Sequence, residues 1–585
     1  MKHQRGFTLI EILIAVSLFL IVAVGIYASY ANLIEVVGRT RTHTLATSLL
    51  NREIEIVRNL PYDSIGIIGG VPAGVIASST TIVYEGQQFV LAATVHSVDD
   101  PFDGRVGGAP SDTALADYRL VQLTLTCPTC FRFVPLSFTT WASPQHLEGS
   151  TKNGALFIDV FDASSNPFSG ADVSIINNNT LPTITISDIT GANGTYELVD
   201  TPTSTLSYRV TVSKTGYSTD KTYAADPVNN PNPQPAYATV ASQQVTEIAF
   251  AIDKLSTLQV TTQDFLCKPI PAITLNQVGD KLIGVEPDVP KYANSVTTNQ
   301  SGTATLNNLE WDTYTFTNTS GSYDIAGVTP FNPFDLDPGV HGSIDFVMEP
   351  HTTNSLLVTS EDESGDPLPE ATVTITDSKG NDTVKLSGER FLTDTDWSAG
   401  TYTSQDGTIE VSNPAGTLKL KKVGNSYPTS THSYLISQTF DFGTATTTLH
   451  SFSWNPTSQP AQTGADSVKF QFAANNDNAT WNYIGPDGTA ETYFTTAVSD
   501  LSAYNNKRYF RYKAYINTVD QNYTPSITDV QLRFTSACVS SYQALFSNLT
   551  TGDYTVAVAK DGYQTTTSTV TVASGWQEDE ETLYP

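Results

Sequence analysis

The sequence predicts a mainly β protein with one long N-terminal α-helix. An almost uninterrupted apolar run from Phe7 to Tyr27 continues into a helix-periodic stretch that ends before Pro61. The rest of the 585 residues is rich in Thr, Ser, Asn, Gly and Pro and alternates apolar with polar residues over short runs. Such alternation is typical of strands joined by turns. Parts of it recur along the chain, so we expect repeated β modules.

The charge and the hydropathy pattern limit where the protein acts. The net charge of −29 argues against a nucleic-acid partner, which would need a basic face. No second apolar run of membrane-spanning length follows the first, so a single-pass topology is expected. Lys2 and Arg5 precede the run, which places the N-terminus in the cytoplasm and the bulk of the chain outside the inner membrane.

The apolar run contains one carboxylate, Glu11, which is costly in hydrocarbon and has no oppositely charged neighbour in the sequence. Beyond Tyr30 the helical pattern continues to Arg58, so a helix from Phe7 would run roughly 80 Å at 1.5 Å per residue. Its second half should lie against a globular domain. The apolar residues of that half recur at three- and four-residue steps: Leu33, Val36, Val37, Leu45, Leu49, Leu50, Ile54 and Val57.

The first residues, MKHQRG followed by FTLIE, resemble the prepilin signal of type IV pilins and pseudopilins. The resemblance rests on a short basic leader, Gly6, the apolar Phe7 and Glu11. It implies cleavage after Gly6 by prepilin peptidase and methylation of the new amine on Phe7. It also implies that Glu11 neutralises the N-terminal amine of a neighbouring subunit in a filament. Major pilins often carry a proline where this chain has Ala28, which argues against a major subunit.

On this basis we expect a leader at 1–6, a transmembrane and amphipathic pilin helix at 7–58, and a pilin-like β domain at 59–150. Within that domain the segment 99–104, DDPFDG, is expected to be a solvated turn. Its three carboxylates also suit Ca²⁺, although the spacing of a known calcium loop is missing.

Repeats follow this domain. The segments 154–175, 256–277 and 354–375 each contain two alternating runs around a Pro-containing loop, and a Lys-x-Gly-Tyr motif recurs at 214–217 and 560–563. The pattern resembles the seven-stranded β-sandwich of carboxypeptidase regulatory-like and Cna-B-like modules. The expected boundaries are 151–253, 254–350, and a split third module made of 351–380 plus 538–585.

The long interruption at 381–537 must be an inserted domain. Its strand order resembles galactose-binding-like jelly rolls, which frequently bind glycans through loops. Trp481 and Tyr483 are candidates for glycan contact, against the alternative that they only pack. Trp454 alternates with Phe452 and is expected in the core. The segment 475–478, Asn-Asn-Asp-Asn, is a weak candidate for Ca²⁺; no other cofactor or metal is expected.

The four cysteines allow disulfides outside the cytoplasm. Cys127 and Cys130 form a CxxC that lacks the second pair a zinc site needs, so we expect a hairpin tip closed by a local disulfide. Cys267 and Cys538 could bridge two modules, but spacing in the sequence does not decide this. No G-x-S-x-G, H-E-x-x-H, P-loop or G-x-G-x-x-G motif is present, so no enzyme activity is predicted.

Together these features predict a minor type IV pilin-like filament subunit that presents extracellular β modules for adhesion or substrate contact. Its partners would be other pilin subunits, prepilin peptidase, the inner membrane and a glycan or other surface ligand. The first alternative is a pseudopilin of a type II secretion or DNA-uptake system. The second is a surface-anchored carbohydrate-active enzyme.

Overall fold

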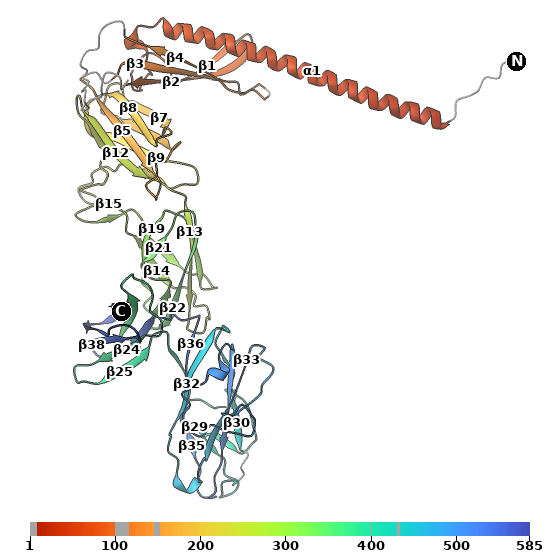
Figure 1. The fold of residues 1–585 in the computed structure, drawn as a ribbon, viewed down its shortest axis with the longest axis vertical. Coiled ribbons are helices and arrows are strands. Elements are labelled where there is room, and N and C mark those ends of the chain that lie inside the picture. The colour runs from red at the N-terminus through yellow and green to blue at the C-terminus, as the bar shows by residue number, and fades with distance from the viewer. Residues whose placement is uncertain (1–8, 100–115, 131, 145–151, 399, 430–432) are drawn as a thin grey trace, which may run out of the picture. The chain divides into compact units, whose positions relative to one another are not determined.

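The computed structural model describes residues 9–99, 116–130, 132–144, 152–398, 400–429 and 433–585 (Figure 1). The chain forms two compact units. One contains Met1–Lys254 with Leu282–Val289, and the other contains Leu255–Lys281 with Pro290–Pro585. The predicted fold class is confirmed, because one long helix precedes a chain of β-sheets. Gly6, Phe7 and the side chain of Glu11 lie outside what the structure describes.

Helix α1 spans Leu9–Arg58. It ends close to Pro61, whose missing N–H and fixed φ oppose a further turn. The last turns pack on the first sheet through buried residues: Ala46, Leu49, Leu50, Ile54 and Val57. The helix begins to pack on the first sheet later than the apolar pattern predicts. The side chains of Leu33, Val36 and Val37 are still 60%, 58% and 60% exposed. The sheet covers only the C-terminal part of the helix.

The first sheet is an antiparallel meander in the order β1-β2-β3-β4. One face is buried against α1, where Leu91 of β2 lies opposite Leu125 of β3 and Val95 lies opposite Val121. The 3₁₀ turn η1 (Tyr62–Ser64) connects the helix toward the sheet. The strands are β1 (Ser79–Tyr84), β2 (Gln87–Val98), β3 (Tyr118–Thr126) and β4 (Leu136–Ala142).

Sandwich 1 follows in the same unit. One sheet has the order β12-β5-β8, the other has the order β10-β9-β6-β7 with β11 beside β9, and both enclose one apolar core. Val71 from the preceding domain joins this core. The strands are β5 (Gly154–Phe161), β6 (Asp172–Asn177), β7 (Ile184–Ile189), β8 (Thr195–Thr201), β9 (Ser204–Ser213), β10 (Asp220–Lys221), β11 (Ala238–Val240) and β12 (Val245–Ala251).

Sandwich 2 has the sheets β18-β13-β22-β20 and β17-β14-β19-β21, and β15 pairs with β16 separately. The strands are β13 (Ser256–Gln263), β14 (Thr274–Gly279), β15 (Leu282–Gly284), β16 (Val289–Pro290), β17 (Ala293–Thr297), β18 (Thr303–Leu309), β19 (Asp312–Asn318), β20 (Tyr323–Thr329), β21 (Phe334–Leu336) and β22 (His341–Pro350).

Sandwich 3 is assembled from two distant parts of the chain. Its sheets are β37-β23-β40 and β25-β24-β38-β39. Its strands are β23 (Asn354–Asp362), β24 (Thr372–Thr376), β25 (Asp382–Leu386), β37 (Gln543–Ser547), β38 (Gly552–Ala559), β39 (Thr566–Val572) and β40 (Gly575–Leu583). The expected start of the insertion at 381 is wrong, because β25 pairs with β24 and therefore belongs to the sandwich. The insertion begins after Leu386.

The three sandwiches share one topology. In each, the first strand pairs in parallel with the last strand and antiparallel with a middle strand: β5 with β12 and β8, β13 with β22 and β18, and β23 with β40 and β37. At the end of each first strand or directly after it, an aspartate accepts hydrogen bonds from backbone N–H groups two and four residues further on: Asp162, Asp264 and Asp362. The repeated sequence pattern thus has a repeated structural cause.

The inserted domain has three sheets, β26-β36-β32, β27-β30-β34-β31 with β33 beside β34, and β28-β29-β35. Phe452 and Trp454 of one sheet meet Phe470 and Phe472 of another in a single aromatic core. The elements are β26 (Arg390–Asp394), β27 (Tyr402–Gln405), β28 (Ile409–Ser412), β29 (Ala415–Leu420), β30 (Tyr434–Ser437), β31 (Phe440–Asp441), β32 (Thr447–Asn455), η2 (Ala461–Thr463), β33 (Val468–Asn475), η3 (Ser502–Tyr504), β34 (Tyr509–Ile516), β35 (Ser526–Ile527) and β36 (Asp529–Ser536).

Candidate functional sites

The exposed part of α1 is the first candidate site. Among the described residues, this is the helix that is long and apolar enough to cross a membrane, and none of its most apolar stretch is buried. Large side chains from Leu9 to Val37 lie at the surface all around the helix. A helix that is apolar on every side requires lipid or other helices around it. Glu35 closes this stretch with an ion pair to Arg39 one turn later.

The CxxC lies at the connection between β3 and β4. Cys127 and Cys130 form a disulfide with their Cα atoms 5.3 Å apart, and the N–H of Cys130 donates to the carbonyl oxygen of Cys127 at 3.2 Å. Cys127 is buried with the core that faces α1. The disulfide therefore closes a tight turn beside the helix, and the described residues of this strand connection include no helix N-terminus of the kind a thioredoxin-type cysteine uses.

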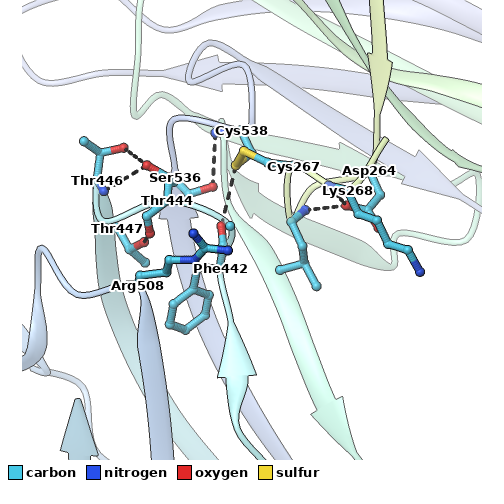
Figure 2. The surroundings of a disulfide bond; sticks show 12 residues. Asp264, Cys267, Lys268, Phe442, Thr444, Thr446, Thr447, Arg508, Ser536 and Cys538 are labelled. Carbon is cyan, nitrogen blue, oxygen red and sulfur yellow. Dashed lines mark hydrogen bonds between the residues drawn. A yellow bond between two sulfur atoms is a disulfide. The ribbon is translucent and has the colours of Figure 1, made fainter. Parts of the chain in front are cut away.

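A second disulfide joins segments that are 271 residues apart. Cys267 lies in the turn after β13 of sandwich 2, and Cys538 follows β36, the last strand of the insertion, with a Cα separation of 5.2 Å (Figure 2). The Cys538 sulfur lies 3.6 Å from the carbonyl oxygen of Phe442. Phe265 and Leu266 from the same turn pack on the core of the insertion. A covalent bond and an apolar contact thus fasten sandwich 2 to the inserted domain.

Sandwich 3 also packs on sandwich 2, along the edge strand β20. The Trp576 indole donates to the carbonyl oxygen of Ile325 at 2.7 Å, and the Tyr542 hydroxyl donates to that of Val328 at 2.7 Å. Edge strands with unpaired backbone groups invite association with other chains. Here side chains from the neighbouring sandwich satisfy those groups, so this edge is closed within the chain.

Arg390 connects the same edge to the first strand of the insertion. Its Nη2 donates to the carbonyl oxygen of Ala326 at 2.7 Å, and its Nε lies 3.1 Å from a carboxylate oxygen of Glu349. The Nε contact is an ion pair that lacks hydrogen-bond geometry. Arg390 is 6% exposed, and burial lowers its pKa against the opposing effect of Glu349 and Glu389. The three modules of this unit are therefore held together by a disulfide, apolar packing and a buried ion pair.

Trp481 and Tyr483 lie beside β34 in the insertion. The Arg511 guanidinium stands over the Trp481 ring at 4.0 Å, and the Lys513 ammonium lies 6.0 Å from the Tyr483 ring. Both aromatic side chains are half-buried. Burial raises the pKa of the Tyr483 hydroxyl. Trp454, by contrast, is 4% exposed in the core, as its alternation with Phe452 predicts.

Two cations beside Trp481 and Tyr483, Arg511 and Lys513, are not among the residues predicted from the sequence. Arg511 and Lys513 alternate with the buried Phe510 and Tyr512 along β34. The period-two pattern of RYFRYKAYIN contains this signal, since alternate residues of a strand point to the same face. This pattern predicts a strand that buries one face and carries basic side chains on the other.

The structure does not favour Ca²⁺ binding at the candidate segment 475–478. The Asp477 carboxylate accepts hydrogen bonds from the N–H groups of Ala479 and Thr480 at 2.9 and 3.0 Å, which lower its pKa to about 2. These bonds define a local turn. Within the described part of the chain, no group of three or more His, Cys, Asp or Glu side chains could hold a metal ion. The 99–104 turn lies outside the described residues except for Asp99.

Residues 1–27 match the family described as the prokaryotic N-terminal methylation motif. No curated protein matches the sequence. The chain thus carries the methylation motif of prepilin-type proteins at the start of the apolar helix α1, ahead of a β-rich chain.

Several solved structures are similar over part of the chain. The Bacillus anthracis TIE protein is 15% identical over 54% of this chain and 54% of that chain, with a TM-score of 0.15. A Streptococcal ancillary pilin is 11% identical over 46% and 77%, with a TM-score of 0.18. The shaft pilin spaA of Lactobacillus rhamnosus GG is 11% identical over 34% and 98%, with a TM-score of 0.14. The chain spans about half the length of the TIE protein, and at these TM-scores the likenesses carry no argument.

Proposed function

We propose that the chain is a low-copy subunit of a type IV pilin-like filament, inserted through α1 and presenting its β modules outside the cell for adhesion or substrate contact. The observation that carries the proposal is the methylation motif at residues 1–27, which leads into the fully exposed apolar part of α1. The role is structural, and the folded modules supply a surface for contact rather than a reaction.

The assembly mechanism follows from the chemistry of the N-terminus. Cleavage after Gly6 would free the amine of Phe7, which is then methylated. In the apolar interior of a filament, the Glu11 carboxylate of one subunit would neutralise the amine of a neighbour, because two opposite charges in a low dielectric are far less costly together than apart. The exposed side chains of α1 would be buried first in the membrane and then against other helices.

The size of the chain after α1 supports a tip or low-copy position. Three sandwiches and an inserted domain follow the first sheet, and closely packed subunits leave little lateral room for such an extension on each copy. In a tip position the modules project from the filament without steric conflict. The second unit suits this role, because its three modules are fastened to one another.

Immunogold labelling of the native cells with antibody against the inserted domain tests the proposal. The expected result is sparse label on extended surface fibres, concentrated at their ends. Label along the full length of the fibres would indicate a major subunit. Label confined to the cell envelope would overturn the adhesive filament and favour a pseudopilin of a secretion or DNA-uptake system.

A further inference from the structure

We propose that the outer face of the sheet formed by β30, β34 and β33 binds an acidic polysaccharide, a sugar polymer that carries carboxylate, sulfate or phosphate groups. The inference depends on the proposed function only for placing this face outside the cell. The binding itself is a property of the folded insertion and does not require a filament.

The face is defined by the register of three strands. On β34 the residues Phe510, Tyr512 and Ala514 point into the core, and Arg511 and Lys513 lie between them on the other side. β33 and β30 flank this strand, so that Lys469 lies opposite Tyr515 on one side and Tyr434 lies opposite Tyr515 on the other. Arg511, Lys513, Tyr515 and their two neighbours therefore share one side of the sheet, where Tyr515 is 9% exposed and the other four are half-buried. We refer to this surface, together with Trp481, Tyr483 and Tyr493 from the adjoining loop, as the cation–aromatic face.

The cations of this face have no acidic partner. In the described part of the chain, no carboxylate lies within ion-pair distance of Lys469, Arg511 or Lys513. The nearby Arg508, by contrast, binds Asp441 at 2.8 Å. The cation–aromatic face is thus a positive surface on an acidic protein, complementary to an anionic ligand.

Aromatic rings lie between these cations. The Lys513 ammonium is 4.2 Å from the Tyr434 ring and 4.8 Å from the Tyr515 ring, and Lys469 is 5.3 Å from the Tyr493 ring. Tyr493 and Tyr515 meet edge to face at 5.0 Å. Contacts of this kind hold the cations in place without neutralising them, because an aromatic ring has no net charge.

The combination of groups defines the ligand class. Aromatic rings pack against the apolar C–H faces of sugar rings, and the cations form charge-assisted hydrogen bonds with anionic substituents. Successive outward residues of a strand are about 6.6 Å apart, so Arg511 and Lys513 suit charges that are spaced along a polymer. A nucleic acid carries a phosphate at every nucleotide and is usually bound by a broad basic surface. Three cations on a protein of net charge −29 fit the narrow contact of a single anionic polysaccharide chain better.

The test uses the full chain in detergent, immobilised and exposed to two matched pairs of polymers: polygalacturonate with its methyl ester, and dextran sulfate with dextran. Single-stranded DNA is the fifth probe. The expected result is binding to the charged member of at least one pair, at least about tenfold tighter than to its neutral partner and weaker at high salt. The double variant Arg511→Gln/Lys513→Gln should weaken this binding at least about tenfold. The matched control Lys421→Gln/Lys422→Gln removes two exposed charges elsewhere in the insertion and should leave the affinity unchanged.

A Tyr434→Leu variant separates a sugar site from a purely electrostatic one. It should weaken binding of the charged polysaccharide while the salt dependence stays the same, because no charge is lost. Equal affinity for the members of both pairs, no binding of any polysaccharide, tighter binding of single-stranded DNA, or equal losses in the two double variants would each overturn the proposal. None of these outcomes depends on filament assembly, which the labelling of cells tests separately.

Discussion

Removing the Cys267–Cys538 disulfide should destabilise the second unit strongly. A cross-link stabilises a fold mainly by lowering the entropy of the unfolded chain, and the effect grows with the logarithm of the loop it closes. For a separation of 271 residues, the chain-entropy relation gives about 5.5 kcal/mol at 25 °C. The Cys127–Cys130 disulfide, with a separation of 3, gives about 1.5 kcal/mol by the same relation. The two bonds thus form a matched comparison within one protein.

Urea unfolding followed by tryptophan fluorescence measures the difference. Of the six tryptophans, Trp141 lies in the first unit and the others lie in the second, so the signal reports mainly on the second unit. The Cys267→Ala/Cys538→Ala variant should lower the urea midpoint by more than about 1 M, for a slope of about 3 kcal/mol/M. The Cys127→Ala/Cys130→Ala variant should leave this transition in place. An unchanged midpoint in the first variant would show that packing alone holds sandwich 2 to the insertion, and would refute the reasoning.

Three further predictions concern single residues. Burial, together with the neighbouring Glu580, raises the pKa of Glu578 to about 7. The folded state is therefore penalised above pH 7 and not below about pH 4.5, so Glu578→Gln should stabilise the protein by about 3 kcal/mol at pH 8 and leave it unchanged at pH 4. Arg390→Met should cost about 3–5 kcal/mol, because Glu349 loses its partner in the ion pair and a buried carbonyl oxygen loses its donor. Glu11→Val should leave membrane insertion intact and reduce incorporation into filaments.

The same unfolding assay checks the first two of these predictions. Glu578→Gln is compared with wild type at both pH values, and an equal effect at pH 4 and pH 8 would show that folding does not change the pKa of Glu578. For Arg390→Met, a loss below about 1 kcal/mol would show that the junction does not depend on the ion pair. For Glu11→Val, membrane fractionation serves as the control, and normal incorporation would disprove the charge-pair explanation of Glu11.

The regular features of the fold were predictable from the sequence, because each has a local cause. The apolar run predicts α1, and Pro61 predicts where the helix ends. Alternating strands followed by an aspartate turn recur in each sandwich. The predicted boundary at residue 380 ends the first half of sandwich 3 too early, because β25 is a short strand of five residues whose role depends on pairing with β24. Local pattern does not contain that pairing.

Features that depend on long-range contacts could not be predicted in this way. The sequence left the pairing of Cys267 with Cys538 undecided, since it requires two Cα atoms from distant segments to lie 5.2 Å apart. The roles of Arg390 and Trp576 depend on an edge strand more than 60 residues away in each case, as sequence separations of 64 and 251 show. The cation–aromatic face is only partly predictable from the sequence. The alternation of basic and buried residues on β34 can be read from the sequence. That no carboxylate of the described residues lies within ion-pair distance of these cations is known only from the folded structure.

The mass of the N-terminal peptide, measured on chains recovered from filaments or membranes of the native cells, tests the central claim most directly. If the chain is a prepilin-type subunit, the peptide should begin at Phe7 and carry one methyl group on its amine. A peptide that still begins at Met1 would show that the leader is not cleaved, and would contradict assembly through the N-terminal helix.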